Sequence, residues 1–414
     1  IRDRFSYKKE HKIFTKTLIA RAGDKFGKKR LKRSFLYVII KKKQKRGVFM
    51  AYDFKKIISR FEIEGELVSC ERYGEGHINE TYLAEVKSGG TEKKYILQRI
   101  NSNLFKDVDK LMNNIRLVTE FNRKKIAERG GDPDRESLSL VYAKGGAAYI
   151  FDEESKGYFR VYKFITDAIA YQIVEKPEDF YQSAVAFGDF ANLLAQFDAT
   201  QLYEVLPNFH NTVKRFKDFE ASLEADRFGR AKDVKKEIDF VLKRRDYCSK
   251  IVDLLASGEM PTKVTHNDTK LNNVMLDAKT GKYVAVIDLD TIMPGSICYD
   301  FGDSIRFGCN TGAEDEPDLG KVNFDINLFE AYAKGYLGAL GSSVTQTERD
   351  NLAFGAILMT YECGMRFLAD YLDGDVYFRT HRPGHNVDRC RTQFKLIEDM
   401  EKAFGEMNAI VKKY

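Results

Sequence analysis

The chain contains few cysteines and no long apolar run, and both shortages narrow the classes of protein it can represent. Its 414 residues include six scattered cysteines with no CxxC pair, which does not make the disulfide framework of a secreted protein. No apolar run approaches the length of a membrane span, and the longest near the start, residues 35–40, lies among lysines. The six histidines and six cysteines do not form the combined Cys/His pattern of a zinc site. We therefore expect a cytoplasmic protein with no membrane partner.

Positive charge is concentrated at one end of the chain. The net charge is +6, but residues 1–49 carry 18 Lys/Arg and 3 Asp/Glu, which leaves 50 and 59 for the rest. One interpretation is an arm that binds nucleic acid or an anionic membrane. We favour the other, an extension before Met50 that is not part of the functional protein, because it shows no aromatic-interleaved binding module. We expect no nucleic-acid partner.

From residue 50 the hydrophobic pattern predicts two lobes of an α+β fold. Residues 50–166 contain short apolar runs between glycine turns and one helix at 107–128, which indicates a small antiparallel β lobe. In residues 167–414 apolar positions recur every three or four residues, as in helices, with short strands near 263–290. The expected architecture is a β-rich lobe followed by a larger helical lobe.

Those short strands flank the polar sequence THNDTKLNN at 265–273. Phosphoryl transfer needs a carboxylate near the attacking hydroxyl, ligands for Mg²⁺ and a cover over the triphosphate. In this H-x-D-x-K-x-x-N pattern we expect Asp268 to accept the substrate proton and Lys270 to reach the γ-phosphate. Both are therefore candidate catalytic residues.

The acidic sequence VIDLD at 286–290 completes the candidate metal site. Asn273, Asp288 and Asp290 offer the oxygen ligands that Mg²⁺ prefers. Two short strands around an AKTG turn predict a hairpin, which brings Asn273 close to Asp288 although they are fifteen positions apart.

The order of these parts resembles the aminoglycoside and choline phosphotransferase family, a kinase-like family that carries H-x-D-x-x-x-x-N followed by I-D. The sequence YDFGDSIRFG at 299–308 matches this family, whereas the DFG of protein kinases is absent from its expected place. The resemblance implies a two-lobed protein-kinase-like fold. It also implies that Asp300 and His266 support the catalytic loop.

Longer segments, over about 67–410, resemble the N-acetylhexosamine 1-kinases within that family. They include YGEGHINETYL, YILQRIN, RVYKFI, IDLDTIMPGS and ECGMRFLADYLDGDVYF. The resemblance implies transfer of the ATP γ-phosphate, with Mg²⁺, to the anomeric hydroxyl of GlcNAc or GalNAc, in the salvage of amino sugars. The partners would be the sugar and ATP, and the protein a monomer or simple homo-oligomer.

A sugar pocket needs buried donors and acceptors to reject near analogues. Arg306, Arg366 and Tyr377 are polar residues in otherwise apolar helical segments, and by resemblance they are candidate sugar contacts. Arg366 has an alternative, an ion pair with Asp370 at i+4. Arg306 would otherwise contact phosphate or support Asp300.

The glycine turn at 73–79 lies where a phosphate-covering loop belongs, although two glycines between strands usually mark only a hairpin. By resemblance His77 and Asn79 are substrate-side residues, with a solvated loop histidine as the alternative for His77. Residues 162–165 are the expected hinge that reads a purine edge. The candidate nucleotide-binding residues are Gly74, Gly76, Gln98, Lys163, Phe164 and Ile165.

The strand YILQRI departs from protein kinases, because it lacks the lysine that pairs the α- and β-phosphates. Gln98 has the better register and Arg99 the right charge, and alternation places them on opposite faces. The resembled sugar kinases also lack this lysine. The acid on the facing helix is either Asp109 or Glu120.

Two rivals remain open. In the first, the same fold acts on another small alcohol: another sugar, an aminoglycoside, choline or homoserine. Cationic acceptors favour an acidic pocket, for which EDEPD at 314–318 is available, although a solvated loop explains it equally well; the arginines favour a neutral, hydroxyl-rich acceptor. A non-catalytic nucleotide-binding protein is disfavoured by the intact Asp268, Asn273 and Asp288.

Overall fold

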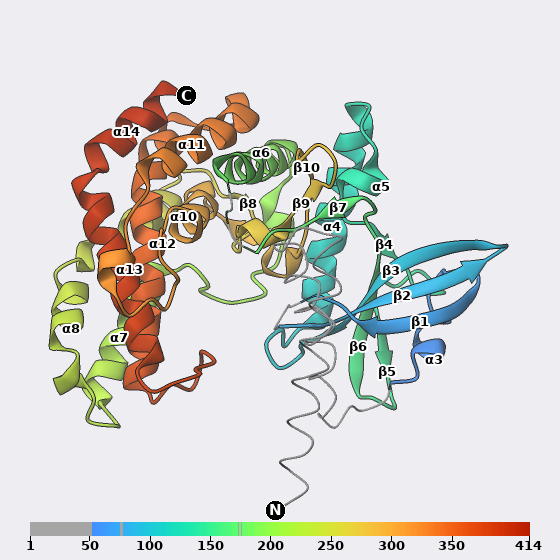
Figure 1. Cartoon of the computed structure of the whole chain (residues 1–414), viewed down its shortest axis with the longest axis horizontal. Helices are drawn as coiled ribbons and strands as arrows, with labels where there is room; N and C mark the ends of the chain where they lie inside the picture. Colours follow the sequence, from blue (N-terminus) through green and yellow to red (C-terminus); the bar gives the residue numbers. More distant parts are fainter. Residues whose placement is uncertain (1–51, 75–77, 173, 175) are drawn as a thin grey trace, which may run out of the picture. The chain divides into compact units, whose positions relative to one another are not determined.

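The computed structural model describes residues 52–74, 78–172, 174 and 176–414. The basic extension at 1–49, Gly76 and His77 lie outside the described residues. Within the rest, an antiparallel sheet is followed along the chain by a mainly helical region (Figure 1). The predicted α+β fold class is confirmed.

The amino-terminal sheet is antiparallel throughout, in the order β1-β2-β3-β6-β4, and β5 also pairs with β6. Burial alternates along β2, and its turn to β3 uses Gly89 and Gly90 at positive φ. The strands are β1 (Glu66–Arg72), β2 (Glu80–Ser88), β3 (Thr91–Ile100), β4 (Leu140–Val141), β5 (Ile150–Asp152) and β6 (Gly157–Lys163).

The predicted helix of this region is α4 (Val108–Glu128), which begins after the capping side chain of Asp107. Leu111, Ile115 and Val118 lie on its buried face, so the apolar spacing correctly identified the side that packs on the core. Two short helices flank it in the chain, α3 (Phe54–Ile58) and α5 (Pro133–Glu136).

Short strands carry the polar segments of the second region. They form a sheet in the order β10-β9-β7 and a separate β11-β8 pair. Val274 pairs with Val286, and the Ile287 N–H donates to the Asn273 carbonyl at 2.9 Å. The predicted hairpin is therefore present. The strands are β7 (Ala168–Ile169), β8 (Lys263–Thr265), β9 (Val274–Asp277), β10 (Tyr283–Val286) and β11 (Met293–Gly295).

Nine longer helices are found in the described part of the carboxy-terminal region, and α12 packs against α10, α13 and α7. They are α6 (Pro177–Leu193), α7 (Thr212–Ala225), α8 (Lys235–Leu242), α9 (Lys250–Ala256), α10 (Ile297–Gly308), α11 (Ile326–Leu340), α12 (Gln346–Leu372), α13 (His385–Lys402) and α14 (Phe404–Lys413).

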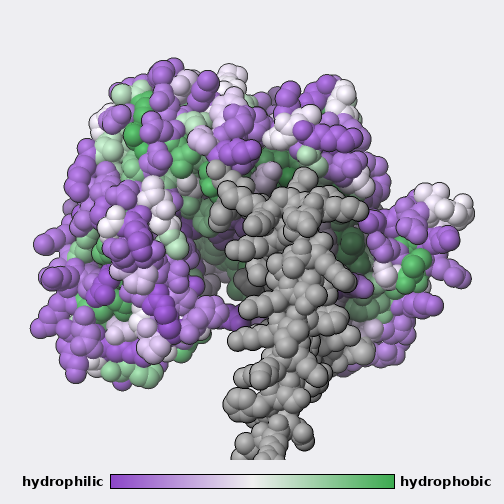
Figure 2. All heavy atoms as spheres, in the orientation of Figure 1, coloured by the Kyte–Doolittle hydropathy of each residue, from purple (hydrophilic) through white to green (hydrophobic). Residues whose placement is uncertain are grey.

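Helix α12 is the central element of this region. A capping box formed by Thr345 and Glu348 starts it. The sequence was expected to contain no apolar run of membrane-spanning length, but α12 is long and apolar enough to cross a membrane by length and composition alone. However, 83% of its most apolar 18-residue window is buried inside the protein. It is thus a core helix, while the face drawn in Figure 2 is mainly hydrophilic with smaller apolar areas.

Candidate active site

The loop after β8 is held by the first turn of α10. Both carboxylate oxygens of Asp300 accept backbone hydrogen bonds from the loop, from the His266 N–H at 2.8 Å and the Asn267 N–H at 2.7 Å. Asn267 has a left-handed backbone with φ of 63°, and an asparagine tolerates this conformation better than most residues. Burial raises the pKa of Asp300, while these hydrogen bonds oppose the shift. Asp300 therefore sets the path of the loop.

The side chain of His266, a residue of this loop, is buried. Its Nε2 lies 2.9 Å from the Ile287 carbonyl oxygen, and its Nδ1 accepts the Asp268 N–H at 3.3 Å. This pattern requires the hydrogen on Nε2. The ring also contacts Phe187 and Phe190 edge-on. His266 thus ties the catalytic loop to the end of the β9–β10 hairpin.

Asp268 is partly exposed and held at both oxygens. Its Oδ1 lies 2.6 Å from Lys270 Nζ, and its Oδ2 accepts a hydrogen bond from Asn273 Nδ2 at 3.0 Å. Burial would lower the pKa of Lys270, but the carboxylates of Asp268 and Asp303 outweigh it and raise the pKa. The loop therefore holds the Asp268 carboxylate in a fixed orientation beside the protonated amine of Lys270.

Asp288 follows β10 in a left-handed backbone conformation, with φ of 61°. Its side chain reaches solvent, yet the surrounding protein desolvates it, and with Asp290 and Asp268 nearby its pKa rises to about 7. The amide nitrogen of Asn273 is bonded to Asp268, which leaves the amide oxygen for another partner. A desolvated carboxylate and an amide oxygen suit a hard cation such as Mg²⁺.

No group of three or more His, Cys, Asp or Glu side chains in the described part of the chain is placed to hold a metal by itself. A cation here would therefore need oxygens from the substrate or water. This is how Mg²⁺ is usually bound, through one or two carboxylates together with phosphates.

Asp290, expected as a third ligand, is occupied by other protein groups. Its Oδ1 lies 2.5 Å from Arg160 Nη1, and its Oδ2 accepts a hydrogen bond from Asn79. The other end of the Asn79 amide accepts the Asn101 N–H at 3.0 Å. Arg160 also donates from Nε to Gln98 at 3.0 Å. Asp290 and Asn79 thus join the β sheet to the turn after β10.

The β3 side chains and the two candidate helix acids do not pair with one another. Gln98 and Arg99 do lie on different sides of β3, since Gln98 meets Arg160 whereas Arg99 pairs with Glu80 at 3.2 Å. Asp109 instead accepts a hydrogen bond from a tyrosine, and Glu120 pairs with an arginine one turn earlier in α4. The buried cation comes from β6, and its acid comes from the turn after β10. Neither origin was predicted.

Two backbone N–H groups of the expected hinge, residues 162–165, already donate to carbonyl oxygens of the protein. The Lys163 N–H donates to the Ser139 carbonyl at 2.9 Å, and the Phe164 N–H donates to the Lys94 carbonyl at 3.2 Å. These two N–H groups therefore do not read a purine in this conformation. Backbone recognition there would involve carbonyl oxygens or the following residue, the buried Ile165.

The described part of the glycine turn approaches this hinge. Gly74 has φ of 73°, a conformation that glycine adopts without strain. The ring of Tyr73 lies 6.0 Å from that of Phe164, edge to face. Aromatic side chains from the turn and the hinge therefore meet on one side of the candidate nucleotide site.

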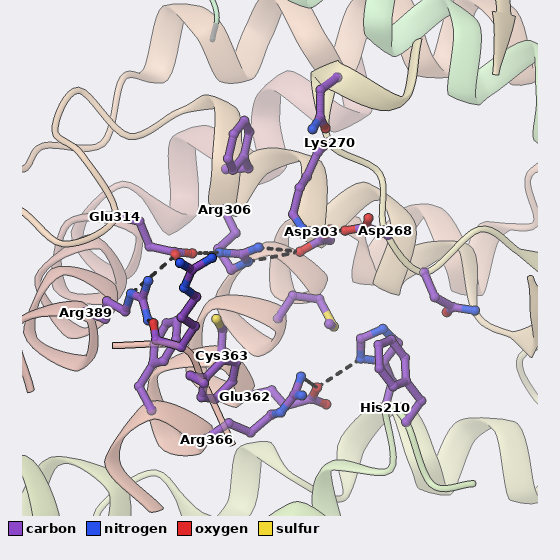
Figure 3. Close-up of a pocket in the computed structure, with 18 of the residues that line it drawn as sticks. His210, Asp268, Lys270, Asp303, Arg306, Glu314, Glu362, Cys363, Arg366 and Arg389 are labelled. Carbon is purple, nitrogen blue, oxygen red and sulfur yellow. Dashed lines mark hydrogen bonds and ion pairs between the residues drawn. The ribbon is translucent and has the colours of Figure 1, made fainter. Parts of the chain in front are cut away.

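A cavity of about 500 Å³ opens beside Asp268 and Lys270 (Figure 3). Loop residues, α10, α12 and α13 contribute its walls. Its carboxylates are Asp268, Asp303, Glu314 and Glu362, and its basic side chains are His210, Lys270, Arg306, Arg366, Arg379 and Arg389. The predicted Arg306 and Arg366 are thus brought together with Asp268, whereas Asn79 and Tyr377 are outside the lining.

A model of the APH phosphotransferase enzyme family matches residues 69–343, about two thirds of the chain. The chain belongs to this family. Its structure is similar to a microcompartment-associated aminopropanol kinase, with a TM-score of 0.53 and 14% identity over 86% of this chain and 97% of that one. It is also similar to an aminoglycoside phosphotransferase from Alicyclobacillus acidocaldarius, with a TM-score of 0.55 and 12% identity over 90% and 99%.

A choline kinase from Cryptosporidium parvum matches with a TM-score of 0.50 and 12% identity over 84% of this chain and 92% of that chain. At these identities the likeness shows a common fold. The protein is therefore a phosphotransferase with a kinase-like fold, as its catalytic loop indicated.

Within this phosphotransferase, Arg366 does not pair with Asp370 and Arg306 does not pair with Asp300, whereas phosphate contact by Arg306 stays a prediction. Arg366 lies 3.9 Å from Glu362, one turn before it, rather than pairing with Asp370. Asp370 instead accepts three backbone N–H groups of the following turn. Arg306 pairs with Asp303 at 2.8 Å and with Glu314 at 3.0 Å, and it does not contact Asp300.

The acidic segment at 314–318 is neither wholly solvated nor an uncompensated acidic wall. Glu314 lines the pocket of the phosphotransferase and is neutralised by Arg306, while Asp315 lies 2.9 Å from His385. The pocket residues missed by sequence reasoning include His210, Asp303 and Glu362. Glu362 and Asp303 are charged residues inside apolar helical segments, and Asp303 lies within YDFGDSIRFG, so both carried a signal, whereas His210 had none.

Proposed function

We propose that this phosphotransferase is an ATP- and Mg²⁺-dependent kinase that phosphorylates the anomeric hydroxyl of N-acetylhexosamines. The observation that carries the proposal is the charge balance of the pocket beside Asp268, where five Lys/Arg side chains accompany four carboxylates. Such a lining suits a neutral, hydroxyl-rich acceptor, because it has no excess of carboxylates to attract a cationic aminoglycoside or choline. The long sequence resemblance to N-acetylhexosamine 1-kinases supports the same acceptor.

In this proposal Asp268 accepts the proton of the acceptor hydroxyl. An anomeric hydroxyl is more acidic than an ordinary alcohol, so one oriented carboxylate suffices, and the rest of the rate comes from positioning and charge neutralisation. Lys270 is 2.6 Å from Asp268 and would turn to the γ-phosphate when ATP binds. His266 and Asp300 keep the loop in place.

Asp288 and Asn273 would hold Mg²⁺, which neutralises phosphate charge when it is bound. Asp290 is assigned to the support of Asp288 rather than to the metal, because Arg160 and Asn79 already occupy it. The nucleotide would lie between the glycine turn around Gly74 and the hinge. We propose a cytoplasmic location for this reaction.

The test is phosphate transfer from labelled ATP with Mg²⁺ to GlcNAc, GalNAc, glucose, galactose, an aminoglycoside, choline, an amino alcohol and homoserine. The product is located by NMR of the anomeric carbon. We expect transfer to position 1 of an N-acetylhexosamine, with kcat/KM at least tenfold above that for glucose and galactose. Preferred transfer to any other acceptor would overturn the proposed substrate and leave the role of Asp268 standing.

A further inference from the structure

A histidine and a glutamate from distant parts of the chain form one polar pair in the wall of the pocket. His210 directly precedes the capping residue of α7, and Glu362 lies in the middle of α12. His210 Nδ1 is 3.0 Å from Glu362 Oε1, with side chains 9% and 1% exposed. Both residues line the cavity that Asp268 also lines (Figure 3).

Each member of the pair keeps one buried polar atom without a partner among the described residues, Nε2 of His210 and Oε2 of Glu362. Buried polar atoms are almost always hydrogen-bonded, because leaving them unpaired costs stability. Two such atoms in one pair, in the wall of a cavity, point to a ligand that completes them.

The hydrogen-bonding roles of the two atoms follow from the charge of Glu362. Burial alone would raise its pKa, but His210 and Arg366 outweigh this and hold the pKa below its usual value. Because Glu362 is then a carboxylate, the hydrogen of the shared contact lies on His210 Nδ1. Oε2 of the Glu362 carboxylate is therefore an acceptor, and Nε2 of His210 is a further acceptor when the ring is neutral. The pair requires at least one donor from its ligand.

The neighbours of the pair supply the complementary chemistry. Arg366 lies 3.9 Å from Glu362 and within 6 Å of the ring centres of Phe209 and Phe378. It thus offers N–H donors beside the two acceptors, on an aromatic surface. In Figure 3 His210, Glu362 and Arg366 are drawn in the lower part of the view, and Asp268 and Lys270 above them. A ligand that reaches both ends would meet the pair with a part remote from its reacting hydroxyl.

We propose that His210 and Glu362 form a specificity subsite that accepts hydrogen bonds from a hydroxyl or amide N–H of the acceptor, away from the group that is phosphorylated. The inference rests on the proposed function only in taking the acceptor to be a small hydroxylated molecule. It assigns substrate selection to α12 and to the segment before α7, whereas the chemistry belongs to the loop after β8.

The test compares native enzyme and Glu362→Gln with the acceptor identified by the panel and with analogues that each lack one of its hydroxyls or its amide. The glutamine keeps the shape of the side chain but can present a donor in place of Oε2. We expect the acceptor KM to rise 10- to 100-fold while the KM for ATP stays within twofold. At least one analogue that is 10-fold or more poorer than its parent for native enzyme should equal the parent for Glu362→Gln.

The matched control is Glu348→Gln. Glu348 is also a buried glutamate of α12 that pairs with Lys263, and its Oε1 has no partner in the described part of the chain, but it does not line the pocket. This variant should lose stability and keep the native acceptor KM and analogue profile.

An unchanged analogue profile in Glu362→Gln would overturn the proposal. If that variant does not fold, His210→Asn is put through the same series, and an unchanged profile there has the same meaning. Because the acceptor is whichever one the panel finds, a different substrate would refute the proposed function and leave this test valid.

Discussion

Arg160 of β6 and Asp290 of the turn after β10 form a buried ion pair with 2.5 Å between Nη1 and Oδ1. The side chains are only 1% and 4% exposed. The pair links the amino-terminal sheet to the turn after β10, which also carries the candidate metal ligand Asp288.

Removing one member of this pair should destabilise the protein strongly, because an uncompensated charge would stay buried. We expect Arg160→Met and Asp290→Asn each to lower the free energy of unfolding by about 3–5 kcal/mol. The double variant should lose less than the sum of the two. Urea denaturation of all four proteins measures this coupling, and strictly additive losses would show that the two side chains do not act as a pair.

Replacing the candidate base should stop catalysis and leave the fold intact. Asp268→Asn keeps the size of the side chain but cannot accept the acceptor's proton, so we expect kcat to fall about 10²–10⁴-fold. The unfolding temperature and the Kd for ATP should stay close to the native values. Turnover within threefold of native enzyme would exclude Asp268 as the base.

The raised pKa of Asp288 predicts that Mg²⁺ binding depends on pH. With its pKa at about 7 in the metal-free protein, protons compete with Mg²⁺ below that pH. The apparent affinity should fall up to about tenfold per pH unit from pH 7 to pH 5 and be nearly constant above pH 8. Calorimetric titration with Mg²⁺ at these pH values measures this, and a flat profile would contradict it.

The raised pKa of Asp288 also makes the stability of the folded protein depend on pH. A salt-bridged carboxylate has a lowered pKa and stabilises the fold as the pH rises, whereas Asp288 should do the opposite. The folded-state pKa lies above the unfolded value, so the folded state binds the proton more tightly. The metal-free protein should therefore lose this contribution as the pH rises from about 4 to 7. Asp288→Asn should flatten that part of the stability profile, measured by thermal unfolding in EDTA.

The contact between α10 and α12 requires glycine. A Cβ added at Gly302 would lie 2.3 Å from the carbonyl oxygen of Gly355, so the helices would have to separate. We expect Gly302→Ala to lower the free energy of unfolding by about 1–3 kcal/mol or more. It should also weaken acceptor binding, since α10 and α12 carry Asp303 and Glu362.

Gly338 provides the matched control for that substitution. It lies inside α11, and an added Cβ would meet no atom within 4 Å. Gly338→Ala should therefore raise the free energy of unfolding by about 0.5–1 kcal/mol, because alanine favours the helix. Equal losses for both variants in urea denaturation would show that close packing is not what Gly302 provides.

The sequence predicted those features that depend only on residues close together in the chain. Apolar spacing identified the buried face of α4, and the AKTG turn identified the β9–β10 hairpin. The polar spacing in residues 265–273 indicated phosphotransferase chemistry, and the family match agrees. Turns, periodicity and catalytic loops are decided by neighbours a few residues apart, which is why they can be predicted.

The partners of charged side chains were decided elsewhere. Arg160 and Asp290 are separated by 130 positions, and His210 and Glu362 by 152. No local pattern predicts such pairs, because a buried charge can take any opposite charge that the packing of distant elements brings within reach. By itself the sequence determined the elements, the catalytic loop and the family. Tertiary packing alone decided which residues line the pocket beside Asp268 and which acid neutralises the buried Arg160. The reason is that a desolvated charge needs an opposite charge nearby, and the fold decides which residue provides it.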